Sequence, residues 1–414
     1  MQIPLSQRIS QMQFSPIRKL RSLELSAQAR GIYIYHLNIG QPDIKTPTVY
    51  WESIRNIEES IPNGVLSYGP SDGIAEYKQA LAAYYRRHQI SVEPENIIVT
   101  TAASEAIIFT LFAICDYGDE IIIPEPYYTN YNGFASISGV RIKPILTSIE
   151  NGFSLPDMSE FSKIVTDKTK AILICNPNNP TGAYYNNETL DNLIDFCIKH
   201  NLYLISDEVY REYTYTEPPV SILQRKGIGT LGIVIDSLSK RYSACGARLG
   251  SICTYNSKLI EQIMKCAQTR LCPPTLEQLA AIAVVNTADN EVENMRIEYC
   301  KRIDTITEAL AKEPDIVFTK PKGGFYFLLK LPITDAEDFA RFLLNDYNLN
   351  GKTVMVTPAD AFYHSADIGK NEIRIAAVLN SDDLKEALKI LIAGLRKYQK
   401  EMQSQTRNPQ FPHA

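Results

Sequence analysis

Between about Asn96 and Thr254, short apolar runs rich in β-branched residues alternate with segments of helical periodicity. Such runs, bounded by turn residues, are typical of buried strands. The predicted strands are 96–101, 119–124, 170–175, 202–206, 231–236 and 250–255. Strands that alternate with helices form right-handed βαβ units and a mostly parallel sheet with helices on both faces. We therefore predict an α/β fold whose ligand lies beyond the carboxyl ends of the strands.

The residues after the predicted strand 231–236 include Ser237, Ser239 and Arg248, which suit a phosphate. The hydroxyl groups can donate hydrogen bonds, and the planar guanidinium can bind a phosphate with two parallel bonds. Lys240 lies between them. A lysine near a cation or in a partly desolvated site spends time as the nucleophilic neutral amine. The segment therefore predicts an amine that attacks a carbonyl group beside a bound phosphate.

Two other interpretations of this segment compete. Lys240 could be an ordinary solvated lysine after a strand, as in most chance matches to so short a motif. Ser237 and Lys240 also fit S-x-x-K, the serine-nucleophile motif of penicillin-binding proteins and β-lactamases. The companion motifs S-D-N and K-T-G are absent from the chain, and the residues before Ser237 indicate a strand rather than a loop. The serine-nucleophile interpretation is therefore the weaker one.

A second candidate phosphate site follows the strand 96–101. Ala102, Ala103 and Ser104 open an apolar helix that continues through Ile114. Small residues at a strand-to-helix turn leave backbone N–H groups and the positive end of the helix dipole facing a ligand. Ser104 could equally be an ordinary N-cap.

The lysine segment resembles the lysine motif of the class I/II aminotransferases, the fold-type I enzymes that use pyridoxal 5'-phosphate (PLP). The resemblance extends from about Ile17 to Tyr398 and is nearest to the aspartate aminotransferase branch. It implies that Lys240 binds PLP covalently and transfers the proton of the substrate Cα. Asp207 matches the carboxylate that keeps the pyridine nitrogen protonated, and Tyr210 matches a tyrosine that hydrogen-bonds the phenolic oxygen. The implied catalytic residues are Lys240, Asp207 and Tyr210.

Further motifs imply other cofactor contacts. Asn179, in P-N-N-P-T-G, matches a residue that hydrogen-bonds the same phenolic oxygen, and Tyr128 matches an aromatic residue that stacks on the pyridine ring. Tyr68 matches a tyrosine that reaches the phosphate of the neighbouring subunit, which implies a homodimer with shared active sites. The complete predicted cofactor set is Tyr68, Ala102, Ala103, Ser104, Tyr128, Asn179, Asp207, Tyr210, Ser237, Ser239, Lys240 and Arg248.

Several of these residues also have a plainer interpretation. Tyr68 could be a simple loop tyrosine, Tyr128 could only pack, and Asp207 in S-D-E could be an N-cap. At the position of Ala102 the family usually has glycine, which leaves open how closely the backbone approaches a phosphate.

Three residues match substrate contacts of the family: Gly40 in G-Q-P-D, Asn179, and Arg374 in R-I-A. The resemblance implies that Gly40 lies beside the substrate α-carboxylate and that Arg374 binds it. By the period of two, Arg374 faces away from Ile373 and Ile375, so it lies either on a solvated face or in a site. Gly40 could also be an ordinary turn residue.

The resemblance implies a PLP-dependent aminotransferase that moves an amino group from an L-amino acid, aspartate or a similar one, to a 2-oxo acid such as 2-oxoglutarate by a ping-pong mechanism. A second substrate carboxylate needs a second cation. Arg270 is a candidate, although a surface arginine at a helix end is the simpler interpretation. A PLP-dependent lyase or decarboxylase, an aromatic or broad-specificity aminotransferase, and a catalytically silent PLP-fold protein stay open as alternatives. The intact Lys240 counts against the last.

The 414 residues are enough for two domains. We predict a large PLP-binding domain over 56–294 and a smaller α+β domain formed by 1–55 and 295–414, with the polar tail 401–414 frayed. A single long helical stretch is expected to end near Leu310. The strands predicted for the smaller domain are 316–319, 325–330, 353–357 and 371–377.

Composition narrows the partners and the location. The net charge of −5 and the lack of a Lys/Arg cluster argue against a nucleic-acid surface, and no apolar stretch approaches the length of a membrane span. The eight cysteines include no C-x-x-C pair and the five histidines are scattered, so we expect free thiols in a reducing compartment and no metal site. The N-terminus lacks a charged segment leading into an apolar one. We therefore expect a cytoplasmic protein with small-molecule partners.

Overall fold

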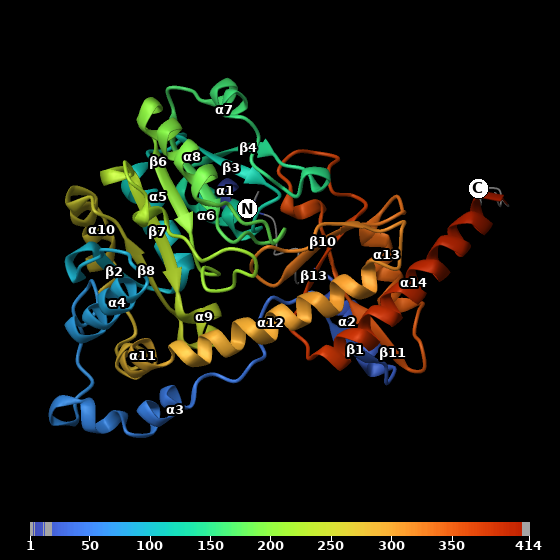
Figure 1. Cartoon of the computed structure of the whole chain (residues 1–414), viewed down its shortest axis with the longest axis horizontal. Helices are drawn as coiled ribbons and strands as arrows, with labels where there is room; N and C mark the ends of the chain where they lie inside the picture. Colours follow the sequence, from blue (N-terminus) through green and yellow to red (C-terminus); the bar gives the residue numbers. More distant parts are fainter. Residues whose placement is uncertain (1–2, 4, 11, 13–18, 408–414) are drawn as a thin grey trace. The chain divides into compact units, whose positions relative to one another are not determined.

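The computed structural model describes residues 3, 5–10, 12 and 19–407, apart from the side chains of 405–407. The chain forms two compact units. Unit 1 comprises Met1–Met12, Gln41–Glu298 and Lys322–Gly324, and unit 2 comprises Gln13–Gly40, Tyr299–Pro321 and Phe325–Ala414. Figure 1 shows the helices and strands of both units.

A seven-stranded sheet forms the centre of unit 1, in the order β2-β8-β7-β6-β5-β3-β4. Its strands are β2 (Ile97–Thr101), β3 (Glu120–Glu125), β4 (Arg141–Leu146), β5 (Thr169–Cys175), β6 (Tyr203–Asp207), β7 (Gly232–Ser237) and β8 (Leu249–Cys253). β8 runs antiparallel to both of its neighbours, and the other pairs are parallel. The predicted mostly parallel α/β sheet is confirmed, with strand ends within one or two residues of the prediction.

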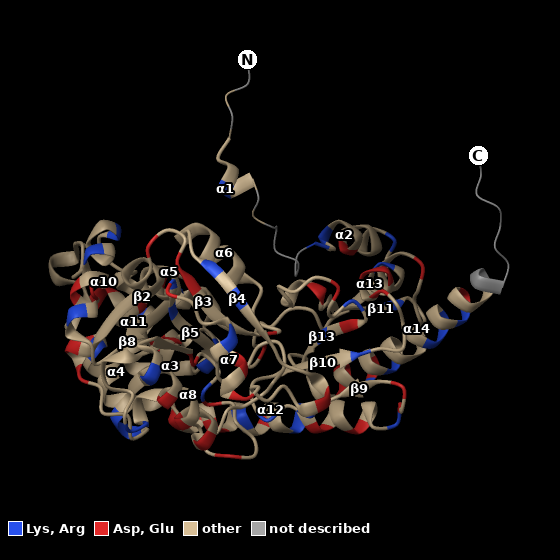
Figure 2. Cartoon of the chain, turned by 90° about the horizontal axis from the view of Figure 1, so that it is seen from above, with Lys and Arg blue, Asp and Glu red and all other residues tan. Residues whose placement is uncertain are grey.

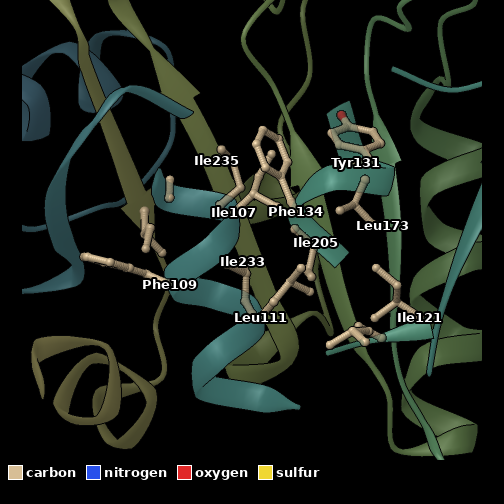
Figure 3. Packing of buried hydrophobic residues seen from close by; sticks show 14 of the residues in the cluster. Ile107, Phe109, Leu111, Ile121, Tyr131, Phe134, Leu173, Ile205, Ile233 and Ile235 are labelled. Atoms are coloured by element: carbon tan, nitrogen blue, oxygen red, sulfur yellow. The ribbon is translucent and has the colours of Figure 1, made fainter. Parts of the chain in front are cut away.

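Helices pack against this sheet through apolar side chains. The helices of unit 1 are α1 (Gln7–Ser10), α3 (Thr48–Arg55), α4 (Ala75–Arg87), α5 (Ala102–Ile114), α6 (Asn130–Ser138), α7 (Met158–Ile164), α8 (Asn187–His200), α9 (Leu238–Arg241), α10 (Ser257–Arg270), α11 (Thr275–Thr287) and the first part of α12 (Asp289–Leu310). Figure 3 shows Ile107 and Leu111 of α5 beside Ile233 and Ile235 of β7, in a cluster that α6 and α10 also join. This packing fixes the strand ends where the predicted site residues lie.

Two parts of unit 1 differ from the prediction. The prediction lacks α1, α3, α9, β4, α6 and α7. The last three were missed because 130–165 mixes Gly, Ser and Asn with isolated apolar residues and has no clear period. The single helical stretch expected to end near Leu310 is two helices, α11 and α12, which are separated at Ala288.

Unit 2 contains two small sheets. β1 (Tyr33–His36) pairs in parallel with β11 (Lys352–Met355), and an antiparallel sheet has the order β12-β13-β10-β9. The strands of this second sheet are β9 (Val317–Phe318), β10 (Tyr326–Lys330), β12 (Thr357–Pro358) and β13 (Glu372–Ala376). The helices of unit 2 are α2 (Arg21–Ala29), α13 (Ala336–Asn345), α14 (Ser381–Arg407) and the second part of α12.

One expectation for unit 2 is corrected, and the one for the C-terminal tail stays untested. The predicted strand 353–357 is divided between β11 and β12, which belong to different sheets. α14 continues to Arg407, and 408–414 lie outside the described residues, so the expected fraying of 401–414 stays a prediction. The segment after Tyr398 is polar but contains no helix breaker before Pro409, which is why the helix continues.

Basic and acidic residues are interspersed along the sequence of α12, as the colours of its ribbon in Figure 2 show. Within the described ranges, the structure has no helix with the length and apolar character needed to cross a membrane.

Candidate functional site

Most of the predicted cofactor residues of unit 1 follow the carboxyl ends of parallel strands. β2, β3, β5, β6 and β7 all point in one direction, so their carboxyl ends lie along one edge of the sheet. The residues at or just after these ends are Ala102, Ala103, Ser104, Tyr128, Asn179, Asp207, Ser237, Ser239 and Lys240. The fold therefore collects side chains from five separate segments at one edge, where open α/β sheets bind ligands.

Asp207 is the last residue of β6 and is buried. Its Oδ2 accepts a hydrogen bond of 2.7 Å from the Tyr131 hydroxyl, and its Oδ1 accepts one of 3.4 Å from the backbone N–H of Val209. Burial raises the pKa of Asp207 to about 6, against the lowering effect of the Tyr131 hydrogen bond. No helix follows Asp207, so the N-cap interpretation is wrong. Among the described residues no Lys, Arg or His forms an ion pair with this carboxyl, so a bound cation would stabilise its ionised form.

Tyr131, on α6, is a site residue that the sequence analysis missed. Its hydroxyl donates to Asp207, and burial raises the pKa of Tyr131 so that the group stays a proton donor. Its ring meets that of Tyr128 edge to face, with centroids 5.6 Å apart. The sequence held one indication of this contact: Tyr128 and Tyr131 are three residues apart, a spacing that brings two side chains to one face of a helical turn.

Asn179 and Tyr210, which are predicted to bind the same oxygen of the cofactor, lie together in the structure. The Asn179 side-chain amide donates to the Tyr210 hydroxyl at 3.4 Å, and both residues are buried. The turn that carries Asn179 is held by Asn178, whose Oδ1 accepts from the backbone N–H and the hydroxyl of Thr181 at 3.2 and 2.8 Å. Tyr128 is half-buried, and its hydroxyl accepts a 2.8 Å hydrogen bond from Asn130.

Lys240 lies on α9, a short helix directly after β7. Ser237 caps this helix, because its Oγ accepts from the backbone N–H of Ser239 at 3.1 Å and donates to the Leu249 carbonyl at 2.8 Å. The Lys240 amine is 3.8 Å from the Cys245 sulfur. Both serines are buried, and the Ser237 Oγ lies 2.9 Å from the Ser239 Oγ.

Arg248 is placed differently from the two serines. Its side chain is exposed, and Nη1 donates to the Cys245 carbonyl at 2.9 Å. Its backbone has φ of 52°, in the left-handed region. The structure thus puts Arg248 between α9 and β8, and none of its described hydrogen bonds joins it to Ser237 or Ser239.

The turn that opens α5 packs tightly against β8. Ala102 is the first residue of α5 and has φ of 63°, a conformation that favours the glycine usual at this position in the resembling family. A Cβ on Gly250 would lie 2.4 Å from the Ala102 carbonyl carbon, so only glycine leaves room for this approach. Ser104 lies inside the helix, and the N-cap interpretation of Ser104 is wrong because the cap is Thr101.

In unit 2, Arg374 is buried on β13 with 1% of its surface exposed, so the solvated-face interpretation is wrong. Its Nη2 donates to the Asn38 carbonyl at 2.5 Å, and the rings of Tyr326 and Phe362 lie 4.7 and 5.0 Å from the guanidinium carbon. A Cβ on Gly40 would lie 1.8 Å from the Tyr326 hydroxyl oxygen. Gly40 is therefore required by close packing and is more than a turn residue.

The structure also shows the surroundings of Tyr68 and Arg270, the two other candidate residues of the sequence analysis. Tyr68 is 81% exposed on unit 1. Arg270 forms an ion pair with Glu105 at 2.7 Å and donates to the Ser71 carbonyl at 2.8 Å. These contacts hold Arg270 within the fold, so its interpretation as a surface arginine is wrong. None of these contacts supports a role in binding the substrate.

A buried charge network, which the sequence analysis also missed, connects the chain neighbours of Lys240 and Asp207. Arg241 donates to Asp236 Oδ1 at 2.7 Å and to Glu212 Oε1 at 2.9 Å. Arg211 donates to Glu208 at 2.8 Å and to Asp236 at 3.3 Å. Buried ion pairs of this kind are strongly destabilising when one partner is removed. The network therefore fixes α9 to β6 and β7.

Comparison with known proteins adds independent information. The model of the family described as aminotransferase class I and II matches residues 34–391. The aspartate aminotransferase of Bacillus subtilis is 30% identical over 398 residues, which cover 93% of this chain and 97% of that protein. The aromatic-amino-acid aminotransferase 2 of Thermococcus litoralis is 30% identical and covers 93% and 96%. The solved structure of the Thermus thermophilus aspartate aminotransferase with maleate has a TM-score of 0.86 at 28% identity, covering 95% of this chain and 100% of that one.

Proposed function

The chain belongs to the class I and II aminotransferase family and is an aminotransferase. We propose that it uses PLP to move an amino group from aspartate or a similar L-amino acid to a 2-oxo acid such as 2-oxoglutarate. The proposed mechanism is ping-pong. The observation that carries the proposal is Asp207, a buried carboxyl group with a raised pKa and a hydrogen bond from Tyr131. Asp207 ends β6, which pairs with β7, and β7 leads directly to Lys240 on α9. A pyridinium nitrogen is the cation that this carboxyl needs.

The residues present fit PLP. Lys240 would hold it covalently, Asp207 would pair with the pyridine nitrogen, and Asn179 and Tyr210 would hydrogen-bond the phenolic oxygen. Tyr128 would stack on the ring. The residues for the phosphate are Ala102, Ala103, Ser104, Ser237, Ser239 and Arg248, with Tyr68 from a second copy. When bound, PLP supplies an electron sink for the bond to the substrate Cα.

The side chains divide the remaining work. Asp207 keeps a proton on the pyridine nitrogen, and Tyr131 holds Asp207 in place. The Lys240 amine takes the proton from the substrate Cα and returns it, a general acid–base step worth about 10²–10⁴-fold in rate. Arg374 would bind the substrate α-carboxylate, and Gly40 and Asn179 are the other proposed substrate contacts. Arg374 is buried between two aromatic rings, where a charge-assisted pair with a carboxylate is strong.

The preference for an acidic substrate is supported by the relatives whose names are aspartate aminotransferase and by the Thermus structure with maleate, a dicarboxylate. Aromatic specificity is the second candidate, because the Thermococcus litoralis relative is named for aromatic amino acids. Half-reaction rates of the PLP form with aspartate, glutamate, tyrosine and alanine separate the two. Faster reaction with tyrosine than with aspartate would overturn the acidic preference. Release of pyruvate and ammonia in place of a 2-oxo acid paired with pyridoxamine phosphate would move the protein to the lyases.

We also propose that the enzyme is a homodimer with shared active sites, that unit 1 is the PLP-binding domain predicted over 56–294, and that the protein is cytoplasmic. The exposed Tyr68 supports the dimer, and the free cysteines support a reducing compartment. Mixing inactive Tyr68→Ala and Lys240→Ala chains should restore part of the activity through hybrids with one intact site. Hybrids that form, as shown by mass, without any activity would remove Tyr68 from the partner's site.

A further inference from the structure

Arg270, the last residue of α10, connects three separate segments of unit 1. Its Nη1 donates to Glu105 Oε2 at 2.7 Å, and its Nη2 donates to the carbonyl oxygens of Ser71 at 2.8 Å and Val99 at 3.4 Å. The guanidinium carbon lies 5.8 Å from the centre of the Phe109 ring. These contacts fix the position of the guanidinium group and of its charge.

The backbone next to Arg270 is strained. Leu271 has φ of 84° and ψ of −87°, a combination that residues other than glycine rarely adopt. The Leu271 side chain is 52% exposed, so its own burial does not explain the conformation. Strained residues persist only where their surroundings fix them, and they concentrate at functional sites. The hydrogen bonds of Arg270 help to hold this end of α10.

Glu105 connects Arg270 to the turn that is proposed to bind phosphate. The same Glu105 Oε2 that accepts from Arg270 also accepts from the backbone N–H of Thr101 at 2.7 Å. Thr101 is the cap residue of α5, and its side chain makes no capping hydrogen bond. Ala102 follows with φ of 63°, and its carbonyl oxygen accepts from the Thr100 hydroxyl at 3.0 Å. Glu105 therefore holds the backbone where this left-handed turn begins.

The charge of Glu105 makes its ion pair important for an anion at this turn. Glu105 lies in the first turn of α5, where the positive end of the helix dipole attracts anions. An unpaired carboxylate here would compete with a phosphate for the N–H groups of 102–104 and would repel it. The ion pair with Arg270 opposes both effects. Its side chains are only 15% and 17% exposed, so it is screened less than a fully exposed pair.

We propose that Arg270 is a positioning residue for the phosphate of PLP. It holds Glu105 against the Thr101 N–H, offsets the charge of the carboxylate and keeps it from the N–H groups of 102–104. Arg270 acts through Glu105 and does not itself contact the phosphate. This inference rests on the proposed use of PLP and on the proposed phosphate turn.

The test compares the binding of PLP with that of pyridoxal, which lacks the phosphate. Both aldehydes would react with the same lysine, so the ratio of their dissociation constants reports on the phosphate contacts. The full-length protein, freed of cofactor, is titrated with each compound, and the bound compound is measured by absorbance. Wild type should bind PLP about a hundredfold or more tightly than pyridoxal, because a phosphate accepts several charge-assisted hydrogen bonds.

Arg270→Met should reduce this preference for PLP about tenfold, because the Glu105 carboxylate loses its cation beside the phosphate turn. Binding of pyridoxal should change by less than about threefold, since pyridoxal carries no charge for Glu105 to repel. An equal loss for both compounds would indicate a purely structural role and overturn the proposal. If Arg270→Met does not fold, Arg270→Gln takes its place, with the same expected result.

The matched control removes a comparable ion pair elsewhere in unit 1. Arg225 donates to Asp191 at 2.8 Å, and neither residue belongs to the predicted cofactor or substrate set. Arg225→Met should therefore leave the preference for PLP unchanged. A fall in preference equal to that of Arg270→Met would mean that any lost ion pair has this effect, and it would refute the specific role of Arg270.

A second substitution separates charge from packing. A glutamine oxygen at position 105 can still accept from the Thr101 N–H but carries no charge. Arg270→Met combined with Glu105→Gln should therefore recover the preference for PLP to within about threefold of wild type. A double variant no better than Arg270→Met would refute the role through Glu105. Equal affinities of wild type for PLP and pyridoxal would overturn the phosphate turn and the proposed cofactor site with it. A wild-type preference that Arg270→Met retains would overturn this inference alone.

Discussion

Two buried aspartates on neighbouring strands of unit 1 differ in their partners. Asp236 on β7 accepts hydrogen bonds from Arg241 and Arg211, and these guanidinium groups hold its pKa below the usual value although burial raises it. Asp207 on β6 has only hydroxyl and backbone donors, and burial raises its pKa to about 6. The fold itself supplies cations for Asp236 and none for Asp207 among the described residues, and we infer that Asp236 has a structural role and Asp207 a functional one.

The largest expected effect is a loss of stability when Asp236 is changed. Asp236→Asn leaves Arg241 and Arg211 buried without their shared partner, so the free energy of unfolding should fall by about 3–5 kcal/mol. Urea denaturation of the PLP-loaded protein, followed by circular dichroism, measures this. Asp382→Asn, at an exposed site on α14, is the control and should change stability by less than about 0.5 kcal/mol. A loss below about 1 kcal/mol for Asp236→Asn would show that the arginines find other partners.

The same change at Asp207 should affect activity and spare the fold. Asp207→Asn removes the charge that holds the pyridine proton, so the half-reaction with aspartate should slow by about 10²–10³-fold. The free energy of unfolding of the cofactor-free protein should stay the same or rise, because no charged partner is left unpaired. Stopped-flow absorbance gives the rate. Near-normal transamination by this variant would remove Asp207 from the mechanism.

The pH dependence of stability sharpens the contrast further. The pKa of Asp207 is about 6 in the folded, cofactor-free protein, against an ordinary value of 3.8 for an aspartate. The folded state therefore binds this proton more tightly than the unfolded state does. This group therefore favours folding fully below about pH 4, and its contribution of about 2–3 kcal/mol is lost as pH rises through 6. Stability curves of wild type and Asp207→Asn at pH 4 to 8 should differ by that amount. Curves with the same slope would contradict the raised pKa.

The smallest effect concerns the tyrosine beside each carboxyl group. Tyr131 donates to Asp207 and Tyr85 donates to Asp236 at 2.9 Å, which makes Tyr131→Phe and Tyr85→Phe a matched pair. Tyr131→Phe should slow the half-reaction about tenfold and raise the pKa seen in its pH profile. Tyr85→Phe should cost about 1 kcal/mol in stability and leave the rate unchanged. Equal effects of the two variants on the rate would mean that the two tyrosines do not differ in role.

The strand ends of unit 1 are predictable from the sequence because apolar β-branched runs end sharply at polar residues. This is why Asp207 and Lys240 are found at the carboxyl ends of β6 and β7, as expected. The buried network is not predictable in this way. Charged residues such as Arg211 and Glu212 are usually exposed, and only their spatial neighbours reveal why these are buried.

Periodicity alone also leaves some faces undecided. It places Arg374 opposite Ile373 and Ile375, yet the rings that enclose it come from Tyr326 and Phe362, in other parts of the chain. Tyr131 was missed for a related reason, because the helix that carries it has Gly and Ser where an apolar period would be seen.

The close approach of Gly40 to Tyr326 has a consequence for how related chains can diverge. A side chain at position 40 would overlap the Tyr326 hydroxyl, whose oxygen lies 3.4 Å from the Gly40 carbonyl oxygen. The same ring lies 4.7 Å from the guanidinium carbon of Arg374. We therefore expect positions 40 and 326 to change together during evolution. A chain that acquires a larger residue at 40 must accept a smaller one at 326 and find another aromatic neighbour for its arginine.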